Sequence, residues 1–245
     1  MLALAHTTSP ALEDIHADVW HAHALGQSVL PVRATGDAAL DAQLPGGGWP
    51  VGAMTEILQQ KGLHCEWRLL LPALVHCDTV VLVGAPQVPF APALAAQGLR
   101  TQALLWVKAQ SSAHSLWATE QALRCADVDA VLAWLPHTGA GAARAEQLRR
   151  LQLAAAGHSK LLFVMRPASA QAEASPAVLR LLVEVQGSAD PAGADALPDA
   201  LRVQLLKRKG PPLPQALQVR ARTSRVSLLL AAARHHALDR TATFA

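Results

Sequence analysis

The sequence predicts an α/β fold with a mainly parallel central sheet and helices on both of its faces. From Val51 onwards, short apolar runs of strand length alternate with amphipathic segments of helix length, a pattern typical of this fold class. The run Thr79–Gly84 is almost continuously apolar, as expected of a central strand that is covered on both faces. With 245 residues, the chain is long enough to bury one large core.

Seven segments have the composition of strands, and four have the composition of helices. We expect strands at Met54–Leu58, Thr79–Gly84, Ala103–Val107, Ala130–Trp134, Lys160–Met165, Val178–Val185 and Leu201–Leu206, and helices at Glu66–His76, Ala91–Gln97, Ser112–Cys125 and Ala142–Ala156. The segment Gln186–Pro198 is rich in Gly, Ala, Asp and Pro, which predicts an exposed hairpin connection between the last two strands.

The remaining residues divide into two appendages. We expect residues 1–33 to form an N-terminal helical arm, because Ala11–Leu25 has helical composition before Pro31 interrupts it. The core then spans residues 34–212. We expect residues 213–245 to form a C-terminal tail that begins at a proline-rich break, in which Val226–Leu238 can make a short helix.

The composition excludes several classes of protein. The three cysteines Cys65, Cys77 and Cys125 have no paired spacing, which favours buried thiols in a reducing compartment. No apolar run is long enough to span a bilayer and no signal sequence is evident, so we expect a cytoplasmic protein without membrane contact. The histidines of the arm, which are His16, His21 and His23, complete no set of ligands with recognisable metal spacing, so no metal site is expected.

Positive charge gathers near the C-terminus, although the formal net charge is only +3. The stretch Leu201–Arg225 contains no acidic residue and seven basic ones, which are Arg202, Lys207, Arg208, Lys209, Arg220, Arg222 and Arg225. Such a cluster can contact DNA phosphates or an acidic partner, and the alternative is a solvated charged face. The few aromatic residues argue against a stacking surface for single-stranded nucleic acid.

The most informative stretch is Thr35–Leu58, TGDAALDAQLPGGGWPVGAMTEIL. Its three consecutive glycines, Gly46–Gly48, permit a tight reversal, and a Pro-x-Gly then sets a second turn before the first strand. A Thr-Gly, a Leu-Asp, a glycine-rich turn, a Pro-x-Gly and a strand containing Glu-Ile follow in the order found at the start of the RecA ATPase core. The stretch therefore resembles that core, which implies a RecA-like fold of the P-loop NTPase type.

The loop after this strand departs from a phosphate-binding loop. It contains Gln59, Gln60, Lys61, Gly62, His64, Cys65 and Glu66, whereas a phosphate loop would read G-x-x-x-x-G-K-[ST]. Cys65 stands at the lysine position and Glu66 at the hydroxyl position. Because a carboxylate there repels phosphate, we expect a degenerate nucleotide loop and no bound ATP.

Two further positions depart from the RecA pattern. Pro86 stands where an acidic residue would orient the attacking water, and Trp134 stands where an aspartate would bind the metal. Phosphoryl transfer depends on positioned charges and metal ions. We therefore expect no ATPase activity and no catalytic residues.

Several motifs along residues 34–212 resemble the ImuA family. They are Glu66-Trp-Arg-Leu-Leu-Leu-Pro-Ala-Leu, Pro86-Gln-Val-Pro-Phe-Ala-Pro-Ala-Leu, Ser115-Leu-Trp-Ala-Thr-Glu-Gln-Ala-Leu-Arg, Arg149-Arg-Leu-Gln-Leu-Ala-Ala and Leu205-Leu-Lys-Arg-Lys-Gly. That family is RecA- and SulA-related and takes part in translesion synthesis and mutagenesis during the bacterial SOS response to DNA damage. The resemblance implies an accessory protein that binds ImuB, a Y-family polymerase homologue, and acts beside RecA and an error-prone polymerase. Lys207 and Lys209 resemble a lysine pair that RecA proteins direct to a neighbouring subunit.

Two other functions remain open from the sequence. One is a DNA-dependent ATPase with a divergent loop, in which Lys61 would be the phosphate-binding cation. The other is a SulA-like inhibitor that caps the GTPase of the division ring. Nucleotide turnover lost in Lys61→Ala would favour the first, and filamentation on overexpression would favour the second.

Overall fold

The computed structural model describes residues 30–60, 62, 64–136, 142–185, 200–211, 213 and 215–220. Its strands are β1 (Val32–Arg33), β2 (Trp49–Pro50), β3 (Ala53–Gln59), β4 (Val80–Val83), β5 (Leu104–Val107), β6 (Ala130–Trp134), β7 (Leu161–Pro167), β8 (Leu179–Val185), β9 (Ala200–Lys207) and β10 (Leu217–Arg220). Its helices are α2 (Ala38–Asp41), α3 (Glu66–Leu74), α4 (Ala91–Ala96), α5 (Ser112–Arg124) and α6 (Ala145–His158), with 3-10 turns η2 (Thr101–Ala103) and η3 (Ala168–Ala172).

The central sheet has eight strands in the order β10-β9-β8-β3-β7-β6-β4-β5. The six strands from β8 to β5 in this order are parallel, whereas β9 pairs antiparallel with β8 and β10 pairs antiparallel with β9. The predicted α/β class with a mainly parallel sheet is thus confirmed. The antiparallel pairing of β8 with β9 also agrees with the predicted hairpin, whose connecting residues 186–199 lie outside the described residues.

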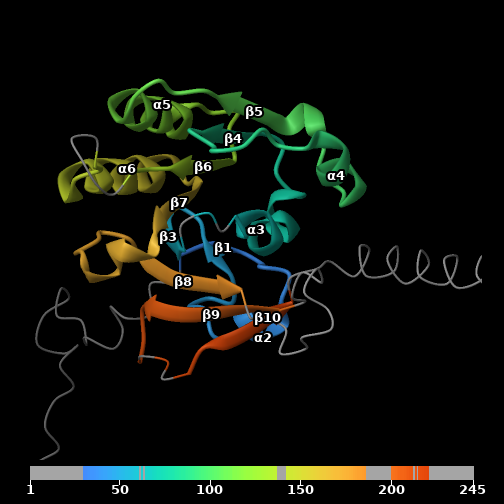
Figure 1. The fold of residues 1–245 in the computed structure, drawn as a ribbon, viewed down its shortest axis with the longest axis vertical. Helices are drawn as coiled ribbons and strands as arrows, with labels where there is room; N and C mark the ends of the chain where they lie inside the picture. Colours follow the sequence, from blue (N-terminus) through green and yellow to red (C-terminus); the bar gives the residue numbers. More distant parts are fainter. Residues whose placement is uncertain are drawn as a thin grey trace, which may run out of the picture.

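Helices cover both faces of the sheet (Figure 1). On one face, alternate strand residues such as Ile57 and Phe163 pack against α2, α3 and α4. On the other face, Met54 and Val164 pack against α5 and α6. All four residues of β4 are buried, as predicted for this apolar run, although β4 lies only one strand from the edge of the sheet.

Backbone geometry explains the glycines at the start of the core. Gly46 and Gly47 have φ values of +80° and +82°, which confirms the tight reversal predicted there. Gly48 is needed for a different reason, because a Cβ atom at this position would lie 2.4 Å from the carbonyl oxygen of Arg33. The reversal places β2 beside β1, where Trp49 then packs edge-on against Phe163 with ring centroids 5.5 Å apart.

The Thr-Gly and Leu-Asp pairs that contributed to the RecA resemblance form one local structure. The backbone N–H of Thr35 donates to the Asp41 carboxylate at 2.9 Å, and the Asp37 side chain caps α2. Gly36 adopts φ +86°, and a Cβ atom there would lie 2.4 Å from Cβ of Pro72 in α3. These residues fix the chain against α3 before it enters the sheet.

Three strands lie outside the predicted set. The pair β1 and β2 has two residues in each strand, and β10 has four. β10 lies beyond residue 212, in the segment assigned to a tail, so the sheet continues to Arg220. Residues 1–29 and 221–245, including the predicted helices Ala11–Leu25 and Val226–Leu238, lie outside the described residues.

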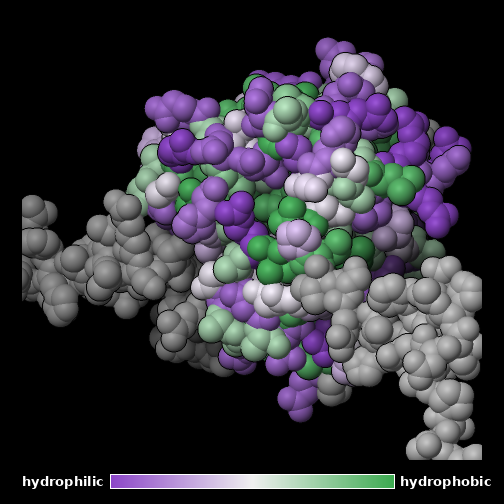
Figure 2. Space-filling model, turned by 180° about the vertical axis from the view of Figure 1, so that it is seen from behind, coloured by the Kyte–Doolittle hydropathy of each residue, from purple (hydrophilic) through white to green (hydrophobic). Residues whose placement is uncertain are grey.

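Hydrophobic residues also reach the molecular surface. On the face shown in Figure 2, hydrophilic residues cover most of the upper half, and hydrophobic residues gather near the middle. The large apolar side chains exposed in the described part of the chain are Leu30, Val88, Phe90, Leu105, Trp117 and Leu153. Of the described helices, none has both the length and the hydropathy needed to cross a bilayer.

Candidate functional site

A pocket of about 340 Å³ opens at the carboxyl ends of three parallel strands, β3, β6 and β7. Its lining residues are Gln59, Gln60, Gly62, His64, Trp134, Leu135, Pro136, Met165, Arg166 and Pro167. In open α/β sheets, ligands bind at this edge, just beyond the carboxyl ends of the strands. The loop after β3, at the position that corresponds to a phosphate-binding loop in the RecA pattern, therefore borders the pocket at this edge of the sheet.

A buried hydrogen-bond network holds this loop. The Gln59 side chain donates from Nε2 to Oε2 of Glu66 at 3.1 Å. Its Oε1 accepts from the backbone N–H of Cys65 at 3.4 Å and from the Cys65 thiol at 3.2 Å. These hydrogen bonds join Gln59 at the end of β3 to Cys65 and Glu66 at the start of α3.

Glu66 lies in the first turn of α3, and the residue is 3% exposed. The N-terminus of a helix carries partial positive charge and free N–H groups, which attract anions. In this protein that position already holds a carboxylate. A phosphate group that entered here would be repelled by the negative charge of the Glu66 carboxylate. Oε1 of this carboxylate lies 3.9 Å from Nδ1 of His64.

Cys65 brings no positive charge to the loop. Burial, and to a smaller extent the nearby Glu66 carboxylate, raise the pKa of its thiol to about 12. The thiol is therefore protonated at neutral pH. In that form it is a poor nucleophile and a poor metal ligand.

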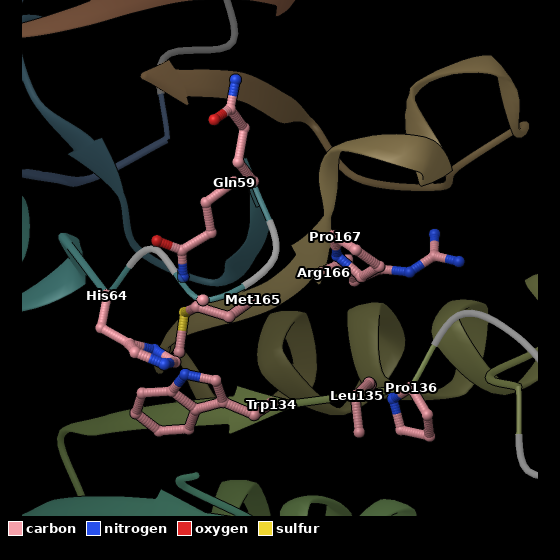
Figure 3. Close-up of a pocket in the computed structure, with 10 residues that line it drawn as sticks. Gln59, His64, Trp134, Leu135, Pro136, Met165, Arg166 and Pro167 are labelled. Carbon is pink, nitrogen blue, oxygen red and sulfur yellow. The ribbon is translucent and has the colours of Figure 1, made fainter. Parts of the chain in front are cut away.

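The pocket walls are largely apolar. Trp134 lines the pocket, and its indole N–H is buried with no hydrogen-bond partner among the described residues. The side chain of Arg166 points away from the pocket, as Figure 3 shows, whereas His64 lies near Trp134 and Met165. Trp134 also lines a neighbouring groove of about 280 Å³ beside Pro86, Val88 and Phe90. The structure thus brings Pro86 and Trp134, the two positions at which the RecA pattern would have acidic residues, to the same edge as Glu66, while Lys61 lies outside the described residues.

A buried ionic cluster lies behind the pocket on three adjacent strands. Glu56 of β3 accepts from Arg166 of β7 at 2.8 Å and from Arg180 of β8 at 2.5 Å. The side chains of Glu56 and Arg166 are completely buried. Arg166 also pairs with Glu173 at 2.5 Å, and Arg180 donates to the carbonyl oxygen of Ala170 at 3.0 Å.

The charges of this cluster balance. Burial acts to lower the pKa of Arg166, but the hydrogen bonds to Glu56 and Glu173 outweigh that effect and raise it. The cluster fastens η3 and the following loop over β3 and β8. The cluster is not among the features predicted from the sequence, although charged residues inside apolar strands, such as Arg166 after LLFVM and Arg180 within LRLLVEV, are a usable signal.

The basic residues near the C-terminus divide into separate groups. Lys207 and Arg208 donate to carbonyl oxygens, Lys207 to Ser175 at 3.0 Å and Arg208 to Pro211 at 2.9 Å. Lys209 is exposed beside them. Arg220 pairs with Ala200 at the far end of β9, seven residues from Lys207 and thus about 23 Å away along the strand. Arg222 and Arg225 lie outside the described residues, as does the side chain of Arg220.

The comparisons with known proteins add no relative: a scan of protein-family models and a search of curated proteins both find no match for the sequence. Among the described residues, no three His, Cys, Asp or Glu side chains gather as metal ligands would.

Proposed function

We propose that this chain is a non-catalytic RecA-like accessory protein of translesion DNA synthesis in the bacterial SOS response. In this role it binds an ImuB-like Y-family polymerase homologue in the cytoplasm, next to RecA and an error-prone polymerase. The family motifs along residues 34–212 support the assignment. The mostly parallel sheet with helices on both faces is compatible with a RecA-like core.

The observation that carries the proposal is the closed network of Gln59, Cys65 and Glu66 at the start of α3. A nucleotide-hydrolysing core needs a cation, a metal-bound hydroxyl and positioned acids at this edge of the sheet. The described loop offers a neutral thiol and a buried carboxylate instead. Binding a triphosphate here would bring like charges together, which argues against nucleotide hydrolysis at this edge. The protein would instead act by binding partner proteins at its surface.

The test measures nucleotide binding and complex formation separately. Titration calorimetry of the full chain with Mg-ATP should give no binding heat, and gel filtration with the ImuB-like homologue should give a complex whose affinity does not change with ATP. Failure to form that complex would contradict the accessory role. ATP binding that is lost in Lys61→Ala but kept in the control Lys209→Ala would support the ATPase alternative.

Direct DNA contact through the basic residues is a second part of the proposal. Lys207, Arg208 and Lys209 lie together at the carboxyl end of β9, and this group can approach phosphates. Binding of a fluorescent oligonucleotide should then weaken steeply with added salt, because phosphate contacts release counterions. Binding unaffected by salt, or by Lys207→Ala with Lys209→Ala, would remove DNA from the proposal.

A further inference from the structure

A groove of about 230 Å³ lies between α5 and α6 on the outer side of the molecule. Its lining residues are Ala113, Leu116, Trp117, Glu120, Gln147, Arg150 and Leu151. Trp117 on α5 is 65% exposed, and Leu153, two residues after the groove residue Leu151 on α6, is also 65% exposed. Two large apolar side chains thus reach solvent on the same pair of helices.

The rim of the groove carries an excess of positive charge. Arg124 and Arg150 both donate to the Glu120 carboxylate, each at 2.6 Å, and both arginine side chains are more than half exposed. One carboxylate cannot neutralise two guanidinium groups, so the triad keeps a charge of +1. Arg144 and Arg149 are exposed on or beside α6, and the opposing acids of the two helices are Glu120 and Glu146. The surface therefore suits an acidic segment with apolar side chains.

The same chain contains such a segment outside the described residues. Residues 12–20, LEDIHADVW, carry three carboxylates, and residues 1–29 contain neither lysine nor arginine. Apolar residues Leu12, Ile15 and Val19 recur at helical spacing, with Trp20 at the end. The segment therefore carries charge opposite to that of the groove rim, and apolar side chains that can cover those exposed there.

The described chain begins at the correct end of α6 for this segment to reach the groove. The carbonyl oxygen of Pro31 accepts from the N–H of Val51 at 2.7 Å, and the next residue, Gly52, donates to Lys160 at 2.9 Å. A Cβ atom on Gly52 would lie 3.7 Å from Cα of Ser159, the C-cap of α6. Residues 21–29 can span about 30 Å when extended, whereas the whole of α6 is only about 21 Å long.

We propose that residues 12–20 of this chain dock into the groove between α5 and α6. Their apolar side chains cover Trp117 and Leu153, and their carboxylates face Arg124 and Arg150. Nucleic acid fits the surface less well, because Glu120 lies in the groove and the described rim presents one exposed aromatic ring rather than a row of them. The proposal does not depend on the accessory role in translesion synthesis.

The experiment uses the full chain with a nitroxide spin label on Cys125, which is exposed directly after Arg124, whereas Cys65 and Cys77 are buried and have raised thiol pKa values. In ¹⁵N spectra, the amide signals of residues 12–20 should lose most of their intensity relative to the reduced label. The triple variant Glu13→Lys, Asp14→Lys, Asp18→Lys should abolish that loss. Trp117→Ala should reduce it, while the control Phe90→Ala, at another exposed apolar position, should leave it unchanged.

Three outcomes would overturn the proposal. The first is an absence of signal loss in the wild-type chain, or a loss that persists in the triple variant. The second is a comparable loss when ¹⁵N-labelled chains without nitroxide are mixed with nitroxide-labelled ¹⁴N chains, because the occupant would then come from a second copy. The third is binding of a fluorescent oligonucleotide that weakens in Trp117→Ala and Arg150→Ala while residues 12–20 show no signal loss.

Discussion

The side-chain amide of Gln59 donates a hydrogen bond of 3.1 Å to the carboxylate of Glu66, joining the last residue of β3 to the first residue of α3. Both side chains are buried, so water could not replace this hydrogen bond if it were lost. The bond supplies a hydrogen-bond donor to the buried Glu66 carboxylate in the first turn of α3. The loop is thereby built around a carboxylate in the place where a phosphate-binding loop would hold a phosphate.

Replacing Gln59 with glutamate tests how strongly the loop depends on this bond. Gln59→Glu would place a second carboxylate against Glu66 in a buried site, and it should lower the free energy of unfolding by about 2–4 kcal/mol at pH 8. Because two carboxylates this close cannot both ionise, part of the loss should be recovered at pH 5. Urea denaturation at the two pH values gives both numbers.

The neighbouring residue Gln60 supplies the matched control, since it is exposed on the same loop. Gln60→Glu adds the same charge in water and should change the free energy of unfolding by no more than about 0.5 kcal/mol. Equal costs for the two variants would show that the network has no special role in stability.

The Cys65 thiol should make the protein sensitive to alkali. Its pKa is raised from 9.0 to about 12 by burial and by Glu66, so the unfolded chain loses this proton at a lower pH than the folded chain. The contribution of this thiol to the free energy of unfolding, about 2–4 kcal/mol, is therefore fully present below pH 9 and is lost as the pH rises from 9 toward 12. Thermal melts between pH 8 and 11 should show a smaller decline in Cys65→Ala than in the wild type. The control Cys125→Ala, at an exposed thiol, should keep the wild-type decline.

Periodicity predicted the main elements of the fold because their burial is continuous. The five strands β3, β4, β6, β7 and β8 are buried along most of their length, and their apolar runs identified all of them to within two residues. Strands β1 and β2 have two residues each, too few to show any period, and β10 follows a proline-rich stretch. For these strands, only pairing with a distant partner reveals the structure.

The contacts of the site could not be read from the sequence. The residue types at Cys65 and Glu66 predict an impaired phosphate loop, and this stays a prediction. The cluster at Glu56 was not predictable in the same way, because its arginine partners are 110 and 124 residues further along the chain. The basic residues near the C-terminus show the opposite case, since Lys207 and Arg220 are close in sequence but the antiparallel pairing of β9 and β10 places them at opposite ends.

A substitution at Gly36 tests the close packing of the chain against Pro72 of α3. Gly36→Ala combines a φ of +86° with a Cβ only 2.4 Å from Cβ of Pro72, so it should lower the free energy of unfolding by about 3 kcal/mol or more. Gly47 is the matched control, because its φ is +82° but a Cβ there would meet nothing within 4 Å. Gly47→Ala should therefore cost only the backbone strain, about 1–2 kcal/mol. Denaturant titration of both variants separates the steric term from the strain, and equal costs would contradict the close packing of Gly36 on α3.

The buried charge of Glu56 makes the strongest stability prediction. Glu56→Gln keeps the shape of the side chain but leaves Arg166 and Arg180 without the carboxylate that both contact, so we expect a loss of about 3–5 kcal/mol. The exposed pair of Glu184 and Arg202, 2.6 Å apart, is the control, and Glu184→Gln should cost at most about 1 kcal/mol. Salt at about 1 M should screen the exposed pair and leave the buried cluster almost unaffected, because ions do not enter the protein interior. If chemical denaturation gave the two variants the same cost and the same salt dependence, the cluster would not be what holds η3 against β3 and β8.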